Sequence, residues 1–123
     1  MILQADLAAL QSFDSHGGIT LSVYLRMDTP ERRDSAYEEF KRQIKARLAE
    51  CNPQPSCREA IKEDMEIVGL YLRTNGHRRH AGLAIFSCAA ELFWRAYPLT
   101  TPLPTQVAVG PQFDLEPLKQ LVR

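Results

Sequence analysis

The chain has 123 residues, enough for one hydrophobic core and one domain. Its 15 acidic and 15 basic residues balance, which excludes the strong positive field of a protein that binds nucleic acid or anionic membranes non-specifically. The sequence contains no apolar run of about 18 residues, and its amphipathic start carries Asp6, unlike a signal peptide, so we expect a cytoplasmic protein without a membrane partner.

The first half of the chain predicts a helix, a strand and a helical hairpin. Apolar residues at helical spacing predict a first helix that ends near Asp14. Residues 19–25 are apolar on both faces and rich in β-branched side chains, which predicts a central strand. Thr29 and Pro30 are typical of an N-cap and a first helical position, and a long helix follows. A loop at residues 51–56 then leads into a second helix, for which Ser56 is the expected cap.

The second half predicts three strands and a short helix. Residues 82–88 and 91–99 form the first two strands, joined by a short connection, and residues 107–109 form the third. Asp114 is the expected cap of the last helix. The element order is therefore α-β-α-α-β-β-β-α. It predicts an α+β fold, or open α/β two-layer arrangement, in which a small mixed sheet of about four strands is packed by the helical hairpin and the terminal helices.

Basic side chains gather at two places. Two histidines and two arginines follow one another before the second strand, and further cations lie on the long helix; arginine matches phosphate oxygens in shape and charge. The predicted RNA-binding patch combines them: His77, Arg78, Arg79, His80, Lys41, Arg42 and Lys45. The alternative is a solvated loop beside a helix whose cations complement its dipole, and the balanced net charge favours that alternative.

The sequence predicts no metal centre, cofactor or catalytic site. The pair Cys51 and Cys57 with His77 and His80 departs from zinc-site spacing. Cys57 at a helix start has no histidine nearby in sequence to act as a base, so we interpret it as structural. The acidic residues of the second helix indicate a solvated face, with Lys62 among them: Glu59, Glu63, Asp64 and Glu66.

Four segments, in this order and spacing, resemble the N-terminal domain of bacterial homologues of the archaeal and eukaryotic translation release factor and its relative Pelota. They are LSVYLRMDTP, the helical hairpin, HAGLAIFSCAAELFWRAYPLTTPLP and VAVGPQFDLEPLKQLV, which together cover nearly the whole chain. The resemblance implies a three-domain parent. Its first domain docks into the ribosome, its middle domain hydrolyses peptidyl-tRNA and its third is L7Ae-like.

The resemblance also implies two decoding segments. The loop that carries Asn-Ile-Lys-Ser in release factors corresponds here to Asn52, Gln54, Ser56 and Arg58, without the Ile-Lys centre. The second motif, Tyr-x-Cys-x-x-x-Phe, falls on Val107, Val109 and Phe113, so that only its phenylalanine is kept. These departures argue against stop-codon reading. The chain also contains no Gly-Gly-Gln, so we expect no ester hydrolysis by this polypeptide alone.

We therefore expect residues 1–123 to be a single domain cut from a longer protein, acting as a non-catalytic ribosome- or RNA-docking domain in translation termination or ribosome rescue. Expected partners are the ribosome, its RNA or tRNA, and the other domains of the parent. The alternative is a protein-interaction module that kept the fold without RNA binding, or that associates with itself. The aromatic residues Phe93, Trp94 and Tyr97 motivate this alternative, although packing in the sheet would also explain them.

Overall fold

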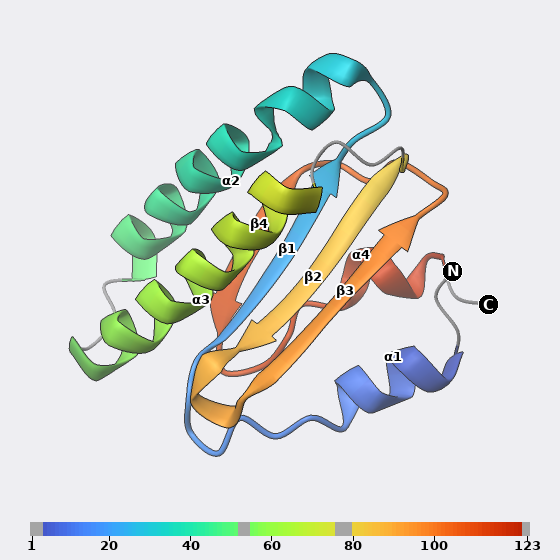
Figure 1. The fold of residues 1–123 in the computed structure, drawn as a ribbon. Coiled ribbons are helices and arrows are strands. Elements are labelled where there is room, and N and C mark those ends of the chain that lie inside the picture. The colour runs from blue at the N-terminus through green and yellow to red at the C-terminus, as the bar shows by residue number, and fades with distance from the viewer. Residues whose placement is uncertain (1–3, 52–54, 76–79, 122–123) are drawn as a thin grey trace.

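The computed structural model describes residues 4–51, 55–75 and 80–121. It confirms the α+β class and the expected order of helices and strands, and adds one 3-10 turn, η1 (Figure 1). The elements are α1 (Gln4–Gln11), β1 (Thr20–Arg26), α2 (Pro30–Cys51), α3 (Pro55–Asn75), β2 (Gly82–Cys88), η1 (Ala89–Glu91), β3 (Phe93–Leu99), β4 (Gln106–Gly110) and α4 (Glu116–Lys119).

The sheet has the strand order β3-β2-β1-β4, and all three pairings are antiparallel. The expectation of a mixed sheet was therefore wrong. The cause is the helical hairpin: α2 carries the chain away along the sheet and α3 brings it back, so β2 starts beside the end of β1. Arg26 consequently pairs with Gly82. The expectation that β1 is central is confirmed, since it pairs with β2 on one side and β4 on the other.

Helices cover both faces of the sheet, which makes three layers instead of the expected two (Figure 1). Alternate residues of β1 point to opposite faces because successive side chains of a strand alternate. Val23 and Leu25 pack under α2 and α3, whereas Tyr24 packs toward α1 and α4. The larger core lies beneath the helical hairpin, and a second core with several aromatic rings lies on the other face.

The helix ends differ in part from the expected positions. Thr29 caps α2 as predicted, because its Oγ1 accepts a hydrogen bond from the Arg32 amide at 3.1 Å. Ser56, the expected cap, lies inside α3, which begins one residue before it, at Pro55, and proline suits a first helical turn. The cap position of α4 is Leu115, while the Asp114 carboxylate accepts from the Glu116 amide at 3.3 Å.

The first helix ends at Gln11, earlier than its apolar spacing indicated. Phe13 still makes a turn-like backbone bond to Leu10 at 3.4 Å. The Asp14 carboxylate then accepts a hydrogen bond from the His16 amide at 2.8 Å, a local turn that competes with helix continuation. Phe13 nevertheless packs against Phe93 and Phe113 in the second core, which explains its place in the apolar pattern.

Candidate functional site

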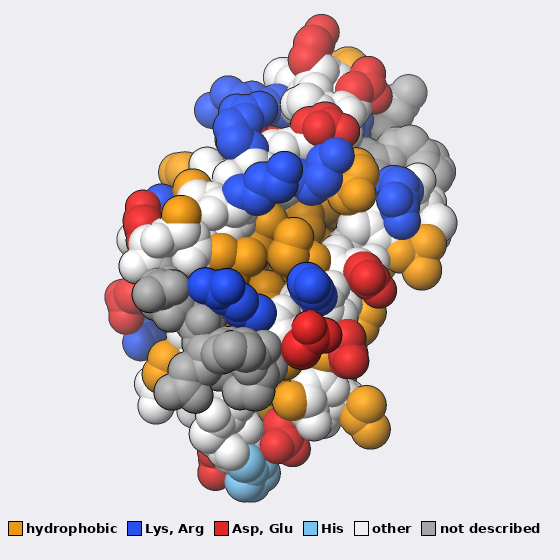
Figure 2. All heavy atoms as spheres, turned by 90° about the vertical axis from the view of Figure 1, so that its left-hand side faces the viewer, with side chains coloured by type: hydrophobic (Ala, Val, Ile, Leu, Met, Phe, Trp, Pro, Cys, Tyr) orange, Lys and Arg blue, Asp and Glu red, His pale blue; other side chains and the backbone are white. Residues whose placement is uncertain are grey.

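A groove between α2 and α3 is the main surface feature of the helical hairpin. It consists of two adjoining cavities of about 210 and 310 Å³, and Met65 lines both of them. Figure 2 shows hydrophobic side chains in the middle of this face, with basic side chains around them. The first cavity is lined by Tyr37, Phe40, Lys41, Met65, Glu66, Gly69 and Arg73, and the second by Leu48, Ala49, Arg58, Ile61, Lys62 and Met65.

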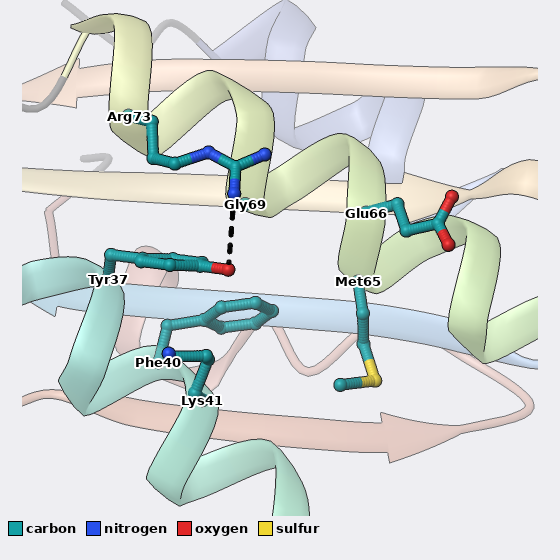
Figure 3. A pocket seen from close by; sticks show the side chains of 7 residues that line it. All are labelled: Tyr37, Phe40, Lys41, Met65, Glu66, Gly69 and Arg73. Carbon is teal, nitrogen blue, oxygen red and sulfur yellow. Dashed lines mark hydrogen bonds between the residues drawn. The ribbon is translucent and has the colours of Figure 1, made fainter.

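The floor of the groove is formed by the apolar stripes of the two helices. Phe40 and Ile61 are buried in the core beneath, and Met65 is half-buried between them and the surface. Figure 3 shows Tyr37 and Phe40 projecting from α2, with Arg73 and Met65 projecting from α3. Because both helices place their apolar residues at intervals of three and four, the two stripes face the sheet and meet along this groove.

Gly69 determines how closely Tyr37 approaches α3. A Cβ atom at Gly69 would lie 3.0 Å from Cε1 of Tyr37 and 3.6 Å from its hydroxyl oxygen. These distances are shorter than or near ordinary van der Waals contact, so the absence of a side chain leaves room for the tyrosine ring. The ring therefore lies close to the backbone of α3 and lines the first cavity.

Two cations lie beside the Tyr37 ring. The Lys41 ammonium is 4.5 Å from the ring centroid and the Arg73 guanidinium is 5.2 Å from it, both within cation–π range. Nη1 of Arg73 also donates a weak hydrogen bond to the Tyr37 hydroxyl at 3.5 Å (Figure 3). These contacts hold positive charge at the edge of an apolar surface. With Arg58, Lys62 and the one carboxylate of Glu66, the lining is predominantly cationic.

The predicted patch residues on α2 are only partly available to an anionic partner. Two of these cations form ion pairs with glutamates three residues earlier on α2. Lys41 lies 3.2 Å from Glu38, and Arg42 lies 2.7 Å from Glu39. Lys45 is exposed, and Lys41 alone of the three lines the groove. The patch cations on α2 thus divide between internal ion pairs and open surface.

The remaining part of the predicted patch follows α3. His77, Arg78 and Arg79 lie outside the described residues, as do Asn52 and Gln54 of the decoding-loop equivalent. His80 is half-buried just before β2.

Two further residues of the decoding-loop equivalent lie on α3. Ser56 falls in its first turn, and Arg58 lines the second cavity of the groove. Arg58, the member of that set whose side chain the structure describes, therefore lies at the candidate site.

The residues equivalent to the second decoding motif lie in or beside the cores. Val107 is buried opposite Val23, and Val109 packs against the same core from its position opposite Leu21. Phe113 is 9% exposed and belongs to the other core, on the opposite face of the sheet. The three side chains therefore do not form one surface, and packing accounts for their apolar character.

Asp64 was wrongly expected on a solvated face. Its side chain is fully buried and accepts hydrogen bonds from the Ser87 hydroxyl and, at 2.9 Å, from the Ala89 amide. Oδ2 has no hydrogen-bond partner among the described residues. Burial raises the pKa of Asp64 above its ordinary value, although its two hydrogen bonds act in the opposite direction. Asp64 lies three residues after Ile61 and four before Val68, so helical spacing was the signal that placed it inside.

Cys88 and the aromatic residues of β3 are held in packing contacts. Cys88 is buried, its thiol lies 3.4 Å from the Ile19 carbonyl, and burial raises the pKa of that thiol. Phe93, Trp94 and Tyr97 are half-buried, and Trp94 packs on Tyr71 with ring centroids 5.5 Å apart. Within the described part of the chain, no three histidine, cysteine or acidic side chains cluster closely enough to hold a metal ion. The Cys57 side chain lies outside what the structure describes.

No family model matches the chain, and no curated protein matches it. Over the described residues, no helix combines the length and the apolar character that crossing a bilayer requires.

Proposed function

We propose that this chain is a non-catalytic docking domain of a release-factor-like protein, and that it binds the ribosome through the outer face of the α2–α3 hairpin. One observation carries the proposal: basic side chains surround an apolar groove on that face, although the chain as a whole has no net charge. Basic side chains attract phosphate, and an apolar groove gives a partner surface to bury. The resemblance in sequence supplies the ribosome as the partner.

Co-sedimentation with ribosomes tests this proposal. Replacing Lys41 and Lys45 by glutamate should release the domain from ribosomes, because both cations lie on the hairpin and their charge is reversed. If both contact phosphate, the slope of log affinity against log salt should fall by roughly two in magnitude.

Lys119→Glu is the control for reversing the charge of a paired lysine such as Lys41. Lys119 lies 3.2 Å from Glu116, the same distance and spacing as the Lys41–Glu38 pair, but it belongs to α4 on the other face of the sheet. This control should bind ribosomes like the unaltered protein. Equal binding by the double variant and the unaltered protein would remove the hairpin from the proposal.

A protein-interaction module independent of the ribosome is the second candidate. It is favoured by the ion pairs on α2, where Glu39 and Glu50 already neutralise Arg42 and Arg47 at 2.7 and 3.0 Å. Cations that are paired within the helix contribute less to phosphate binding. The two candidates differ in salt dependence: binding through several phosphates weakens steeply as salt rises, whereas binding that mainly buries apolar surface in the groove weakens less, through its few charged contacts alone.

A further inference from the structure

We infer that the groove between α2 and α3 receives an amphipathic helix of a partner protein, with apolar side chains against the floor and acidic side chains along both edges. The inference rests on the proposed docking role of this face and names the chemistry of what is docked. The length of the groove, its apolar lining and its charged edges support the inference.

The length of the groove suits a helix of about four turns. On α3 the lining runs from Arg58 to Arg73, which is about 22 Å at the helical rise of about 1.5 Å per residue. On α2 it runs from Tyr37 to Ala49, about 18 Å by the same rise. A helix satisfies its own backbone hydrogen bonds and can lie against apolar side chains, whereas an extended segment would leave peptide groups unpaired there.

The floor can accept apolar side chains of varied shape. Met65 lies where the two cavities meet, and an unbranched thioether adapts to different neighbours. Tyr37 provides aromatic surface at one end and Leu48 aliphatic surface at the other, above Phe40 and Ile61, which are buried beneath them. A partner helix with apolar residues at intervals of three and four would place one side chain in each cavity.

The charges around the floor select an acidic partner. Lys41 stands on the α2 side and Lys62 and Arg73 on the α3 side, whereas Glu66 is the one carboxylate among the lining residues. Carboxylates along the α3 edge of a docked helix would meet Lys62 and Arg73. Those along the α2 edge would share Lys41 with Glu38, 3.2 Å away. A basic helix would meet repulsion from these cations.

The same arrangement disfavours RNA in the groove. Single-stranded RNA binds by stacking its bases on open aromatic faces. At the Tyr37 ring, Lys41 and Arg73 already lie within cation–π distance and would have to move before a base could stack. Apolar side chains entering beside these cations require no such displacement.

Two synthetic peptides test the inference by fluorescence anisotropy with the full chain. Both carry the same leucines at helical spacing over four turns, with glutamates on the flanks of one and lysines on the flanks of the other. The acidic peptide should bind at least about tenfold more tightly, because cations on both walls attract one peptide and repel the other. Equal binding of the two peptides, or no binding of the acidic one, would overturn the inference.

Variants locate the binding site. Lys62→Glu reverses an exposed charge and should weaken acidic-peptide binding by roughly threefold to tenfold. Met65→Glu and Met65→Lys both remove the thioether, but the glutamate should weaken binding far more, since only it repels the peptide. Lys119→Glu should bind like the unaltered protein. Thermal unfolding of each variant verifies the fold, and unchanged affinity in Lys62→Glu and Met65→Glu would place the peptide elsewhere and refute the groove.

Ribosome co-sedimentation separates this inference from the function on which it rests. If Met65→Glu loses peptide binding but keeps ribosome binding, the groove is the peptide site and the ribosome contact lies elsewhere. If an RNA oligonucleotide displaces the peptide from the groove and binds there more tightly, the protein-helix assignment is wrong while the docking role stands. If the peptide binds and ribosomes do not, the ribosomal partner alone is wrong.

Discussion

Asp64 is the residue where burial and ionisation conflict most directly. Its carboxylate connects α3 to the end of β2 through the Ser87 hydroxyl and to η1 through the Ala89 amide. Charge type alone assigned it to the surface with Glu63, whereas its position in the helical repeat assigned it to the inside. Burial of a carboxyl group is tolerated here because two donors that come from far along the chain satisfy Oδ1. Such donors cannot be identified from the helix sequence alone.

Asp64 should make the stability of the fold fall as pH rises. Its pKa is raised in the folded state, so the folded protein keeps a proton that the unfolded chain has lost, and unfolding releases it. The free energy of unfolding should therefore decrease from the ordinary pKa near 3.8 up to the folded pKa, by about 1.4 kcal/mol for each unit between them. The contribution of neutral Asp64 to the free energy of unfolding is fully present at low pH and is lost above that window.

Urea unfolding of the unaltered protein and Asp64→Asn across this pH range measures the effect. Asparagine keeps an oxygen acceptor for Ser87 and Ala89 but does not ionise. Groups with the opposite dependence, such as Asp28, whose pKa is lowered by Arg26, are common to both proteins and cancel in the difference. As pH rises across this window, the free energy of unfolding of the unaltered protein should fall relative to that of Asp64→Asn. Parallel curves would show that Asp64 does not titrate differently on folding.

At the scale of elements, local signals predicted the order of helices and strands well, and tertiary contacts explain the exceptions. The cap at Thr29 and the buried run of β1 follow from short-range chemistry, so they were predictable. The antiparallel direction of β2 depends on two helices of nearly equal length, 22 and 21 residues, returning the chain to its starting edge. No local pattern encodes that pairing, and the mixed sheet was expected for this reason.

Thr29 should contribute measurably to the start of α2. Thr29→Ala removes the oxygen that accepts from the Arg32 amide and should lower the free energy of unfolding by about 1 kcal/mol. Thr29→Ser keeps the acceptor and should lie within a few tenths of a kcal/mol of the unaltered protein. Urea unfolding at neutral pH measures both variants. Equal losses for alanine and serine would mean that the methyl group, and not the cap, is responsible.

At the scale of the whole molecule, the sheet separates a candidate binding side from a packing side. The groove and its cations lie on the hairpin, while α1, α4 and the aromatic cluster around Phe113 pack on the opposite face, beside a separate cavity of about 270 Å³. The sequence predicted cations on the long helix but not the groove, because a groove depends on the separation of two helices. Likewise, apolar residues 107 and 113 share one short segment but belong to different cores, since the chain crosses the sheet edge between them.

Matched substitutions in the two cores should separate stability from binding. Phe40→Leu and Phe113→Leu each replace a buried ring by a smaller side chain, and each should lower the free energy of unfolding by about 1 to 2 kcal/mol. Phe40 lines the groove, so its replacement should also weaken binding of the acidic peptide. Phe113 lies on the other face of the sheet, and its replacement should leave the affinity for the peptide unchanged.

Urea unfolding and peptide anisotropy on the same samples provide the two quantities. Comparing variants of similar stability removes the effect of a partly unfolded population on apparent affinity, since that effect would be shared. If Phe113→Leu weakens peptide binding as much as Phe40→Leu does, binding depends on the fold as a whole and not on the hairpin surface. A loss of peptide affinity confined to Phe40→Leu would instead mean that the packing of the second core does not affect the shape of the groove. The binding surface would then depend only on the hairpin and the strands directly beneath it.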